Sequence, residues 1–395
     1  EKDKSLSTIK EQAKLAERLG DKISQIYALM GLASIYGEDD PDKAYEYQKE
    51  ALQLSKKIGN KNAEGLLLRS IARYFMDQKK DYTKALEYAK ISREIFKKLD
   101  DKEYEANSLD FVGEVYIELG DYESALDCAN QSLDLNKDID HEQGIFYSTL
   151  KVGFLLYKYG KDYNKALEYF SRASKKIEEE NTPPIYTLTY ISYISAYYQY
   201  IGDYDSAIEN RNRAQNISEE INNINWEINI LQKLGFLYTN MGENDKGFEH
   251  FRQAKEKSDA MNFSKTELAQ NLMNIGWVYL TKGDYKIAAE QYLDKALELK
   301  KETGDDLGLW GSLCLYLSYK HLGRDYDVAH IKKLINEENN IDFETNYMIY
   351  QLLGERPYLK TAYDQVKERE DVLDTKLREK FYNYPTPKAI IEEWE

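Results

Sequence analysis

The sequence predicts an all-α protein, built as a solenoid of tandem helix pairs. One phrase of residues recurs every 40 to 42 residues along most of the 395-residue chain. With only 6 Pro and 21 Gly and with 42% hydrophobic residues, the composition also suits a folded, helix-rich chain. A single hydrophobic core stops growing at about 250 to 300 residues, but a repeat array escapes this limit because each unit packs only on its neighbours.

The repeated phrase consists of a small residue, a Tyr three residues later, then Gly-Asp-Tyr and Ala-Leu. It is clearest at Gly113, Tyr116, Gly120-Asp121-Tyr122 and Ala125-Leu126. The small position recurs at spacings of 41, 41, 40, 42, 40, 41 and 40 residues, at Gly31, Ala72, Gly113, Gly153, Ser195, Gly235, Gly276 and Tyr316. The last copy has Tyr316 at this position, and Gly247 replaces the later Ala of its unit. We expect looser or reshaped packing at both points.

Each unit is predicted to form two amphipathic helices. In the unit around Gly113, the first helix carries an apolar stripe at Leu109, Val112, Tyr116 and Leu119. Gly120 is suited to end this helix in the left-handed conformation, and Asp121 is suited to cap a second helix that runs to about Lys137. A small side chain lets one helix approach another closely. Later, Pro183-Pro184 is expected to interrupt the helical structure before the sixth pair begins.

The phrase also predicts how the chain is divided. We expect residues 1–345 to form a solenoid of about eight helix pairs after an N-terminal half-repeat, and residues 346–395 to form a helical capping segment. The last pair would otherwise leave an apolar face in water. The residues expected to cover that face are Leu373, Leu377, Phe381 and Ile390, with Trp394 closing the end.

This pattern resembles the tetratricopeptide repeat family over roughly residues 5–345. The units are longer than the 34-residue form and are similar to the long-helix version in kinesin light chains, cell-polarity adaptors and bacterial signalling proteins. The resemblance implies a right-handed α-solenoid that binds other protein segments. The tail, with Leu377-Arg378, Phe381, a Pro and the final Trp394, resembles the end of repeat arrays attached to bacterial nucleotide cyclases and signalling ATPases.

The resemblance further implies which residues line a concave groove, because the first helix of each pair faces it. The expected groove residues are Arg69, Arg73, Asn107, Tyr147, Phe154, Tyr157, Gln199, Tyr200, Asn229, Gln232, Phe236, Asn240, Gln270, Trp277 and Trp310. Asn and Gln could pair with the backbone of an extended peptide, while aromatic residues could supply anchor pockets. Alternatively, these aromatic residues pack between adjacent first helices and fill a tight superhelix.

Other functional classes find little support in the sequence. A net charge of -16 argues against nucleic-acid binding, and the absence of an apolar run of about 18 residues argues against a membrane span. We find no catalytic, phosphate-binding or dinucleotide-binding motif, and we expect no cofactor. His141, His250, His321 and His330 lack metal-ligand spacing, and Cys128 and Cys314 are expected to be buried apolar residues in a reducing cytoplasm.

The leading hypothesis is therefore a non-catalytic scaffold or sensor module that captures a peptide or a partner helix in its groove. An alternative is the regulatory part of a larger bacterial signalling enzyme, a nucleotide cyclase or ATPase. Its catalytic domain would lie upstream of Glu1, since the sequence begins without Met and we expect a piece of a longer chain. A third reading is a peptide-pheromone receptor.

Overall fold

The computed structural model describes residues 2–37, 40–179, 182–261, 264–338 and 340–395. In these ranges the regular secondary structure is helical throughout, which confirms the predicted all-α class. The chain forms two compact units, Glu1–Ala173 and Ser174–Glu395. The predicted division at residue 345 stays a prediction; in the structure that point lies within a helix, Phe343–Leu353.

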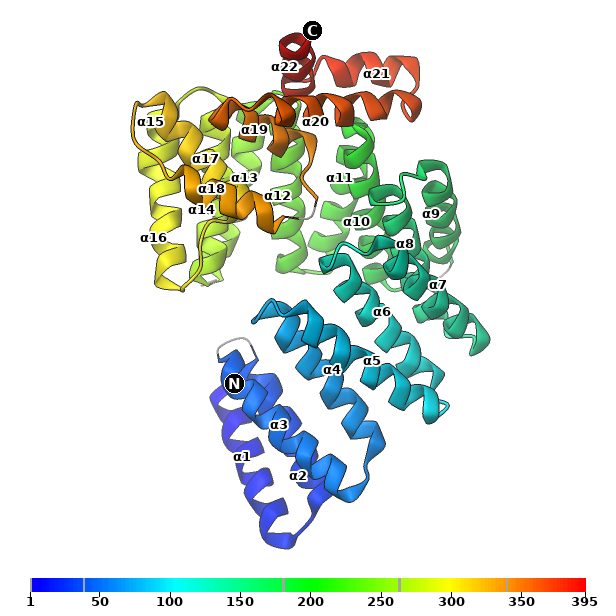
Figure 1. The fold of residues 1–395 in the computed structure, drawn as a ribbon. Coiled ribbons are helices and arrows are strands. Elements are labelled where there is room, and N and C mark those ends of the chain that lie inside the picture. The colour runs from blue at the N-terminus through cyan, green and yellow to red at the C-terminus, as the bar shows by residue number, and fades with distance from the viewer. Residues whose placement is uncertain (1, 38–39, 180–181, 262–263, 339) are drawn as a thin grey trace. The chain divides into compact units, whose positions relative to one another are not determined.

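In the first unit, helices that are adjacent in the sequence pack side by side in chain order (Figure 1). A first helix, α1, precedes four pairs, and the last helix ends past the boundary at Ala173. The helices are α1 (Lys2–Leu19), α2 (Lys22–Tyr36), α3 (Pro41–Ile58), α4 (Lys61–Asp77), α5 (Tyr82–Lys98), α6 (Lys102–Glu118), α7 (Tyr122–Asp138), α8 (Glu142–Lys158) and α9 (Tyr163–Ile177).

The second unit continues the pairing and then departs from it. Its paired helices are α10 (Pro184–Ile201), α11 (Tyr204–Glu220), α12 (Ile224–Asn240), α13 (Asn244–Ala260), α14 (Lys265–Thr281), α15 (Tyr285–Ile287), the π-helical η1 (Ala288–Leu293), α16 (Asp294–Glu302), α17 (Gly308–His321) and α18 (Val328–Glu337). The tail follows as α19 (Phe343–Leu353), α20 (Arg356–Lys367), the 3-10 turn η2 (Glu368–Asp371), α21 (Thr375–Tyr382) and α22 (Pro385–Trp394).

The turn between the two helices of a pair forms as the phrase predicts. At the end of α6, Gly120 adopts a φ of 76°, which a residue without a Cβ tolerates well. The side chain of Asp121 then accepts a hydrogen bond of 3.1 Å from the Ser124 backbone N–H and caps α7. Asp81 and Asp203 cap α5 and α11 in the same way.

The small position of the phrase is the point where the second helix presses against the first. A Cβ on Gly235 would lie 2.7 Å from the ring of Phe251, and one on Gly276 would lie 2.7 Å from Leu293. At Gly153 the ring of Phe170 would be 2.9 Å away. The packing reason inferred from the sequence therefore holds in both units.

The two departures from the phrase have different structural consequences. A Cβ on Gly247 would lie 2.2 Å from the Thr239 hydroxyl oxygen, so Gly lets α13 approach α12 closely there. The hydroxyl of Tyr316 lies 3.3 Å from Nδ1 of His330, a residue of the short helix α18. The packing at Tyr316 is thus reshaped around an aromatic ring.

A one-residue insertion explains the π-helical segment η1. Phe251 follows Gly247 by four positions in α13, but Leu293 follows the equivalent Ala288 by five. The wider π turn absorbs the extra residue, so Leu293 still faces Gly276.

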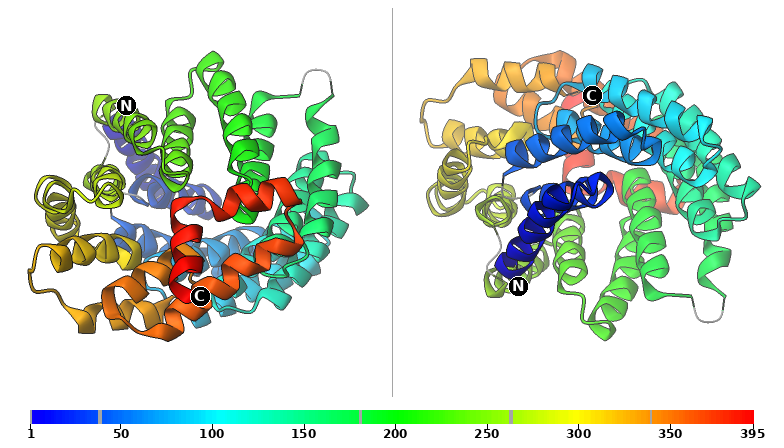
Figure 2. Two further views of the ribbon diagram at one scale, coloured as in Figure 1. Left: turned by 90° about the horizontal axis from the view of Figure 1, so that it is seen from above. Right: turned by 90° about the horizontal axis from the view of Figure 1, so that it is seen from below.

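The tail takes a course that the sequence did not predict. We expected it to cover the last pair, and its first helix, α19, does pack on α17, with Ile349 and Leu352 in the same buried cluster as Leu313. Helices α20 to α22, however, lie across the turns of earlier pairs in the second unit (Figures 1 and 2). Phe381 packs on Gly202 and Pro385 packs on Gly242, so a Cβ on either Gly would clash. Phe381 and Ile390 are fully buried and Leu373 is buried, whereas Leu377 is only half-buried. The ring of Trp394 packs on Tyr363 of α20.

Candidate functional site

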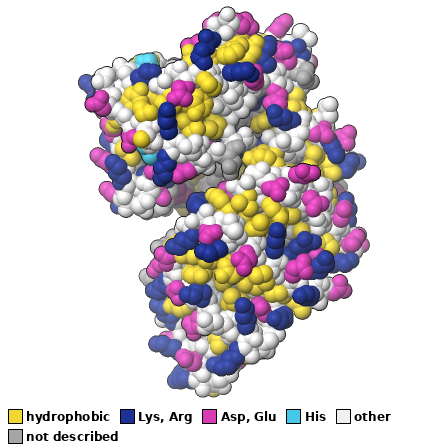
Figure 3. All heavy atoms as spheres, viewed as in Figure 1, with side chains coloured by type: hydrophobic (Ala, Val, Ile, Leu, Met, Phe, Trp, Pro, Cys, Tyr) yellow, Lys and Arg dark blue, Asp and Glu magenta, His cyan; other side chains and the backbone are white. Residues whose placement is uncertain are grey.

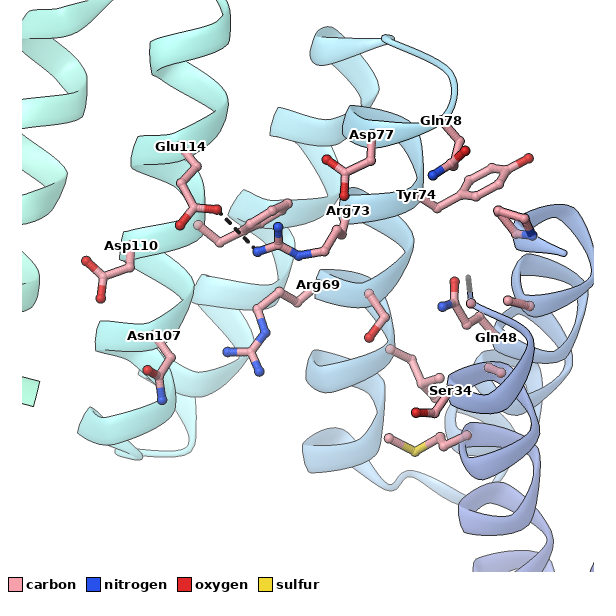
Figure 4. Close-up of a pocket in the computed structure, with 18 residues that line it drawn as sticks. Ser34, Gln48, Arg69, Arg73, Tyr74, Asp77, Gln78, Asn107, Asp110 and Glu114 are labelled. Atoms are coloured by element: carbon pink, nitrogen blue, oxygen red, sulfur yellow. Dashed lines mark hydrogen bonds and ion pairs between the residues drawn. The ribbon is translucent and has the colours of Figure 1, made fainter. Parts of the chain in front are cut away.

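The first unit contains a groove of about 730 Å³ between the first helices of neighbouring pairs (Figure 4). Its lining includes Met30, Ala33, Ser34, Gly37, Pro41, Ala44, Gln48, Leu67, Arg69, Ser70, Arg73, Tyr74, Asp77, Gln78, Asn107, Asp110, Phe111 and Glu114. Two polar rows face each other across it, one from α4 and one from α6. Three of the predicted residues, Arg69, Arg73 and Asn107, lie in this groove.

Helical spacing produces the two rows. Arg69, Arg73 and Asp77 are four residues apart on α4, so their side chains share one face of the helix. Asn107 and Asp110 lie three residues apart on the facing surface of α6. Hydrogen-bond donors therefore predominate in the row on α4, and acceptors predominate in the row on α6.

Most of the charges in the groove pair with one another. Arg73 forms an ion pair of 3.2 Å with Glu114, and its guanidinium lies over the ring of Phe111 at 4.6 Å. Lys151 of α8 approaches Glu114 at 3.2 Å and donates a hydrogen bond of 2.8 Å to the backbone oxygen of Asp110. Burial raises the pKa of the Asp110 carboxyl, and the nearby Lys151 ammonium partly offsets this rise.

Arg69 differs from these residues. Within the described part of the chain, its guanidinium forms neither an ion pair nor a hydrogen bond, although the side chain is half-buried. In Figure 4 it extends from α4 toward Asn107. Burial lowers the pKa of Arg69, and the neighbouring Arg73 adds to the effect, but an arginine stays charged in proteins.

The second unit contains another pocket, of about 420 Å³, which combines repeat helices with the tail. The lining residues are Thr239, Asn240, Gly242, Asn244, Trp277, Leu280, Thr281, Tyr285, Trp310, Leu317, His321, Glu344, Tyr347, Met348, Gln351, Pro385, Thr386 and Ala389. Three predicted residues, Asn240, Trp277 and Trp310, meet here. The other lining residues come from the repeat helices and their turns and from α19 and α22 of the tail.

The aromatic side of this pocket is a fixed cluster. The rings of Trp277 and Trp310 meet edge to face with centroids 5.8 Å apart, and Phe236 packs on both at 5.1 and 5.7 Å. Across the pocket lining, His321 stacks on Tyr285 at 3.9 Å. Because each ring is held by another, the wall is already formed without a ligand.

Glu344 supplies the acidic group of the pocket. Asn240 donates a hydrogen bond of 3.2 Å to its carboxyl oxygen, and the Tyr204 hydroxyl donates a longer one of 3.5 Å. Burial raises the pKa of Glu344 to about 8, and the nearby Asp342 carboxylate contributes to the rise. The Arg369 guanidinium acts in the opposite direction but does not cancel the effect.

The other predicted residues lie outside the lining of these two pockets. Tyr157 is only 2% exposed and its ring packs against Phe170, so it belongs to the core of its helix pair and we leave it out of the proposed contacts. The half-buried residues outside both linings are Tyr147, Phe154, Gln199, Tyr200, Gln232, Phe236 and Gln270, and the exposed one is Asn229.

Some of these residues have contacts that explain their place. Gln232 donates to the Asn271 side chain at 2.9 Å, which ties α12 to α14. Gln270 donates to the Asn274 side chain at 3.0 Å within α14. The backbone oxygen of Tyr200 accepts a hydrogen bond of 2.9 Å from Arg369 of the tail.

The sequence analysis missed the residues that the tail brings to the second pocket. Glu344 and Tyr347 come from α19, and Thr386 comes from α22. They follow the last copy of the phrase, so the repeat register says nothing about where they point. Only the return of the chain across the turns places them beside Trp277 and Trp310.

Three further features of the described residues concern membrane-spanning helices, metal sites and surface charge. None of the helices in the described residues combines the length and the apolar character needed to cross a membrane. Within the same residues, no group of three His, Cys, Asp or Glu side chains is arranged to hold a metal ion. On the face drawn in Figure 3, basic and acidic side chains are interspersed across each unit.

Comparison with known structures gives low sequence identities throughout. The chain is 20% identical to BtubC from P. vanneervenii, with a TM-score of 0.48, covering 56% of this chain and 92% of that one. It is 14% identical to a signal transduction ATPase with a tetratricopeptide repeat sensor from Pyrococcus horikoshii, with a TM-score of 0.49, covering 93% of this chain and 52% of that one. It is 14% identical to a Rap protein complexed with Competence and Sporulation Factor, with a TM-score of 0.41, covering 100% of this chain and 99% of that one.

Sequence comparison identifies the repeat directly. No curated protein sequence matches the chain significantly. Residues 65–138 match one family model of the tetratricopeptide repeat, and residues 269–303 match another. These segments lie in different units and coincide with the helix pairs of the recurring phrase, so the chain carries tetratricopeptide repeats in both of its units.

Proposed function

We propose that this chain is a non-catalytic interaction module that captures an extended peptide segment of a partner protein along its first helices. Its fold is that of a protein-interaction scaffold. The finer assignment, a scaffold or sensor acting in the cytoplasm, is part of the proposal. In such a role the bound segment transmits the signal, and no chemical turnover is required.

The observation that carries the proposal is the unsatisfied charge of Arg69 in an open groove. A half-buried guanidinium has lost part of its hydration, and no described residue replaces it with a hydrogen bond. A carboxylate from a bound segment would restore both the charge balance and the hydrogen bonds, since guanidinium and carboxylate pair in a bidentate way. The groove therefore favours a peptide with an acidic side chain or a free carboxyl terminus.

The surroundings of Arg69 suit an extended chain. Asn107 is exposed on the opposite wall, and Gln48 and Gln78 line the groove on the other side. Amide side chains offer both a donor and an acceptor, which is what the backbone of an extended peptide requires. A groove of about 730 Å³ has room for several peptide residues.

A peptide-display selection on the full chain tests the proposal. We expect the selected peptides to carry a carboxylate, and Arg69→Gln to raise their Kd about tenfold or more, because a hydrogen bond to a charged group contributes about 1.5–3 kcal/mol. Lys57→Gln is the matched control, since Lys57 is exposed on α3 outside the groove lining. Failure to select any peptide, or equal binding by Arg69→Gln and Lys57→Gln, would contradict the proposed function.

A further inference from the structure

The pocket of the second unit has a charge character opposite to that of Arg69. Its lining contains one carboxyl group, that of Glu344, and no Lys or Arg side chain. The lining also contains the imidazole of His321, whose ring is stacked on Tyr285. A ligand group in this pocket would therefore meet an acid that no cation of the lining neutralises.

The partners of Glu344 within the protein are neutral. Asn240 and Tyr204 donate to the same oxygen, Oε1. No Lys or Arg of the described residues lies at ion-pair distance from this carboxyl. Arg369 is the closest candidate, but its guanidinium donates to the backbone oxygens of Tyr200 and Gln365 and lies over the ring of Phe343 at 4.6 Å.

The indole wall fits the same kind of ligand. Trp277 and Trp310 line the pocket that Glu344 enters. The face of an indole attracts cations more strongly than the other aromatic rings do, and a planar guanidinium can stack on it while its N–H groups reach a carboxylate. An aromatic wall and one carboxyl together are complementary to arginine.

We propose that this pocket binds the guanidinium of an arginine side chain, carried by a peptide segment, with Glu344 as its acceptor and Trp277 and Trp310 as its aromatic walls. The peptide origin of the arginine rests on the proposed function above. The site itself is separate from the groove at Arg69, because it lies in the other unit and is built from other residues.

The protonation state of Glu344 makes the binding pH-dependent. The groups around this carboxyl are Asp342 on its own segment, Tyr204 of α11, Asn240 of α12, His321 of α17 and Arg369 of η2. Burial and, after it, the Asp342 carboxylate raise the pKa of Glu344 to about 8 against the opposing effects of Arg369 and Tyr204, so this carboxyl group is mainly protonated at pH 7. Binding a guanidinium then releases a proton, and affinity rises with pH up to about 8.

The experiment uses the full chain and the probe N-acetyl-arginine amide, followed by titration calorimetry and by tryptophan fluorescence. N-acetyl-citrulline amide has nearly the same shape without the charge. We expect the arginine probe to bind at least about tenfold more tightly than the citrulline probe, because only the cation pairs with the carboxylate. The preference should grow between about pH 6 and about pH 8.

Glu344→Gln keeps the size of the side chain and should abolish both the preference for arginine and its pH dependence. Trp310→Leu removes one wall without touching the carboxyl and should weaken the arginine probe while leaving the pH dependence. Glu379→Gln is the control, since Glu379 is exposed on α21 and outside the lining. Circular dichroism verifies that each variant is folded.

Absence of arginine binding, equal binding of the two probes, or an unchanged preference for arginine in Glu344→Gln would overturn the proposal, and unchanged affinity for the arginine probe in Trp310→Leu would overturn the role of the indole wall. The result is distinguishable from the peptide selection. A chain that selects no peptide but binds the arginine probe through Glu344 would refute the proposed function and leave the chemistry of this pocket standing.

Discussion

At the scale of single residues, the recurring Gly positions are determined by the side chain that faces them. The ring of Phe251 sits over Gly235 and is itself wedged against Phe236 and Trp277. Gly113, by contrast, faces only Cys128 and the backbone of Ala125, at ordinary contact distances of 3.4 Å. The same position of the phrase is therefore sterically strict in one unit and tolerant in another.

This contrast predicts opposite effects of one substitution. Gly235→Ala should lower the free energy of unfolding by about 1–3 kcal/mol, because the new methyl group overlaps the Phe251 ring, which is packed against Phe236 and Trp277. Gly113→Ala should be neutral or stabilising by up to about 1 kcal/mol, because Ala favours the helix and meets no clash. Urea denaturation of both variants measures the difference, and equal effects would contradict this explanation.

At the scale of elements, the tail works as a brace on the turns of the second unit. Phe381 packs between the rings of Tyr204, Phe343 and Tyr384, at centroid distances of 6.4, 6.0 and 6.3 Å. Arg369 adds a hydrogen bond to Tyr200 at the end of α10. These contacts connect the last helices of the chain to a pair that precedes them by more than a hundred residues.

Truncating the centre of this brace should therefore be costly. Phe381→Ala is expected to lower the free energy of unfolding by about 3–5 kcal/mol. Removal of this fully buried aromatic side chain leaves a cavity that the surrounding turns cannot fill. Glu379→Ala, on the exposed face of the same helix, should change it by no more than about 0.5 kcal/mol. If urea denaturation gives similar values for the two variants, the tail does not brace the second unit.

At the scale of the whole molecule, the chain consists of two compact units, each with cores of its own. Clusters around Leu67 and around Leu109 lie in the first unit, and clusters around Leu234 and Leu313 lie in the second. In repeat arrays, stability is the sum of the units and of their contacts with nearest neighbours. A segment with enough pairs should consequently fold without the rest.

We predict that residues 1–182, which end just before Pro183 and α10, form a stable helical protein by themselves. They contain a half-repeat and four pairs, and about three repeats suffice for an array to fold. Circular dichroism and a cooperative thermal transition are the readouts. A largely unfolded fragment would mean that the first unit depends on contacts from residues beyond it.

Much of the fold follows from local sequence. The phrase around Gly113 and Asp121 specifies where a helix ends, where the next begins and which face is apolar, since capping and helical periodicity act over a few residues. Three residues that line the groove at Arg69 are expected from the resemblance to a repeat family, which implies that the first helix of each pair faces a groove. What the sequence determined by itself is therefore the repeating unit and the row of side chains that each first helix presents.

The tertiary structure alone decided the rest. Tyr157 fits the register of a groove residue, yet its ring is buried against Phe170, because burial depends on the neighbour's side chain and not on the spacing. Glu344 and Thr386 join Trp277 in one pocket only because α19 packs on α17 and α22 begins over the turn at Gly242. No local pattern encodes such a return, since its contacts join residues far apart in the chain and outside the repeat.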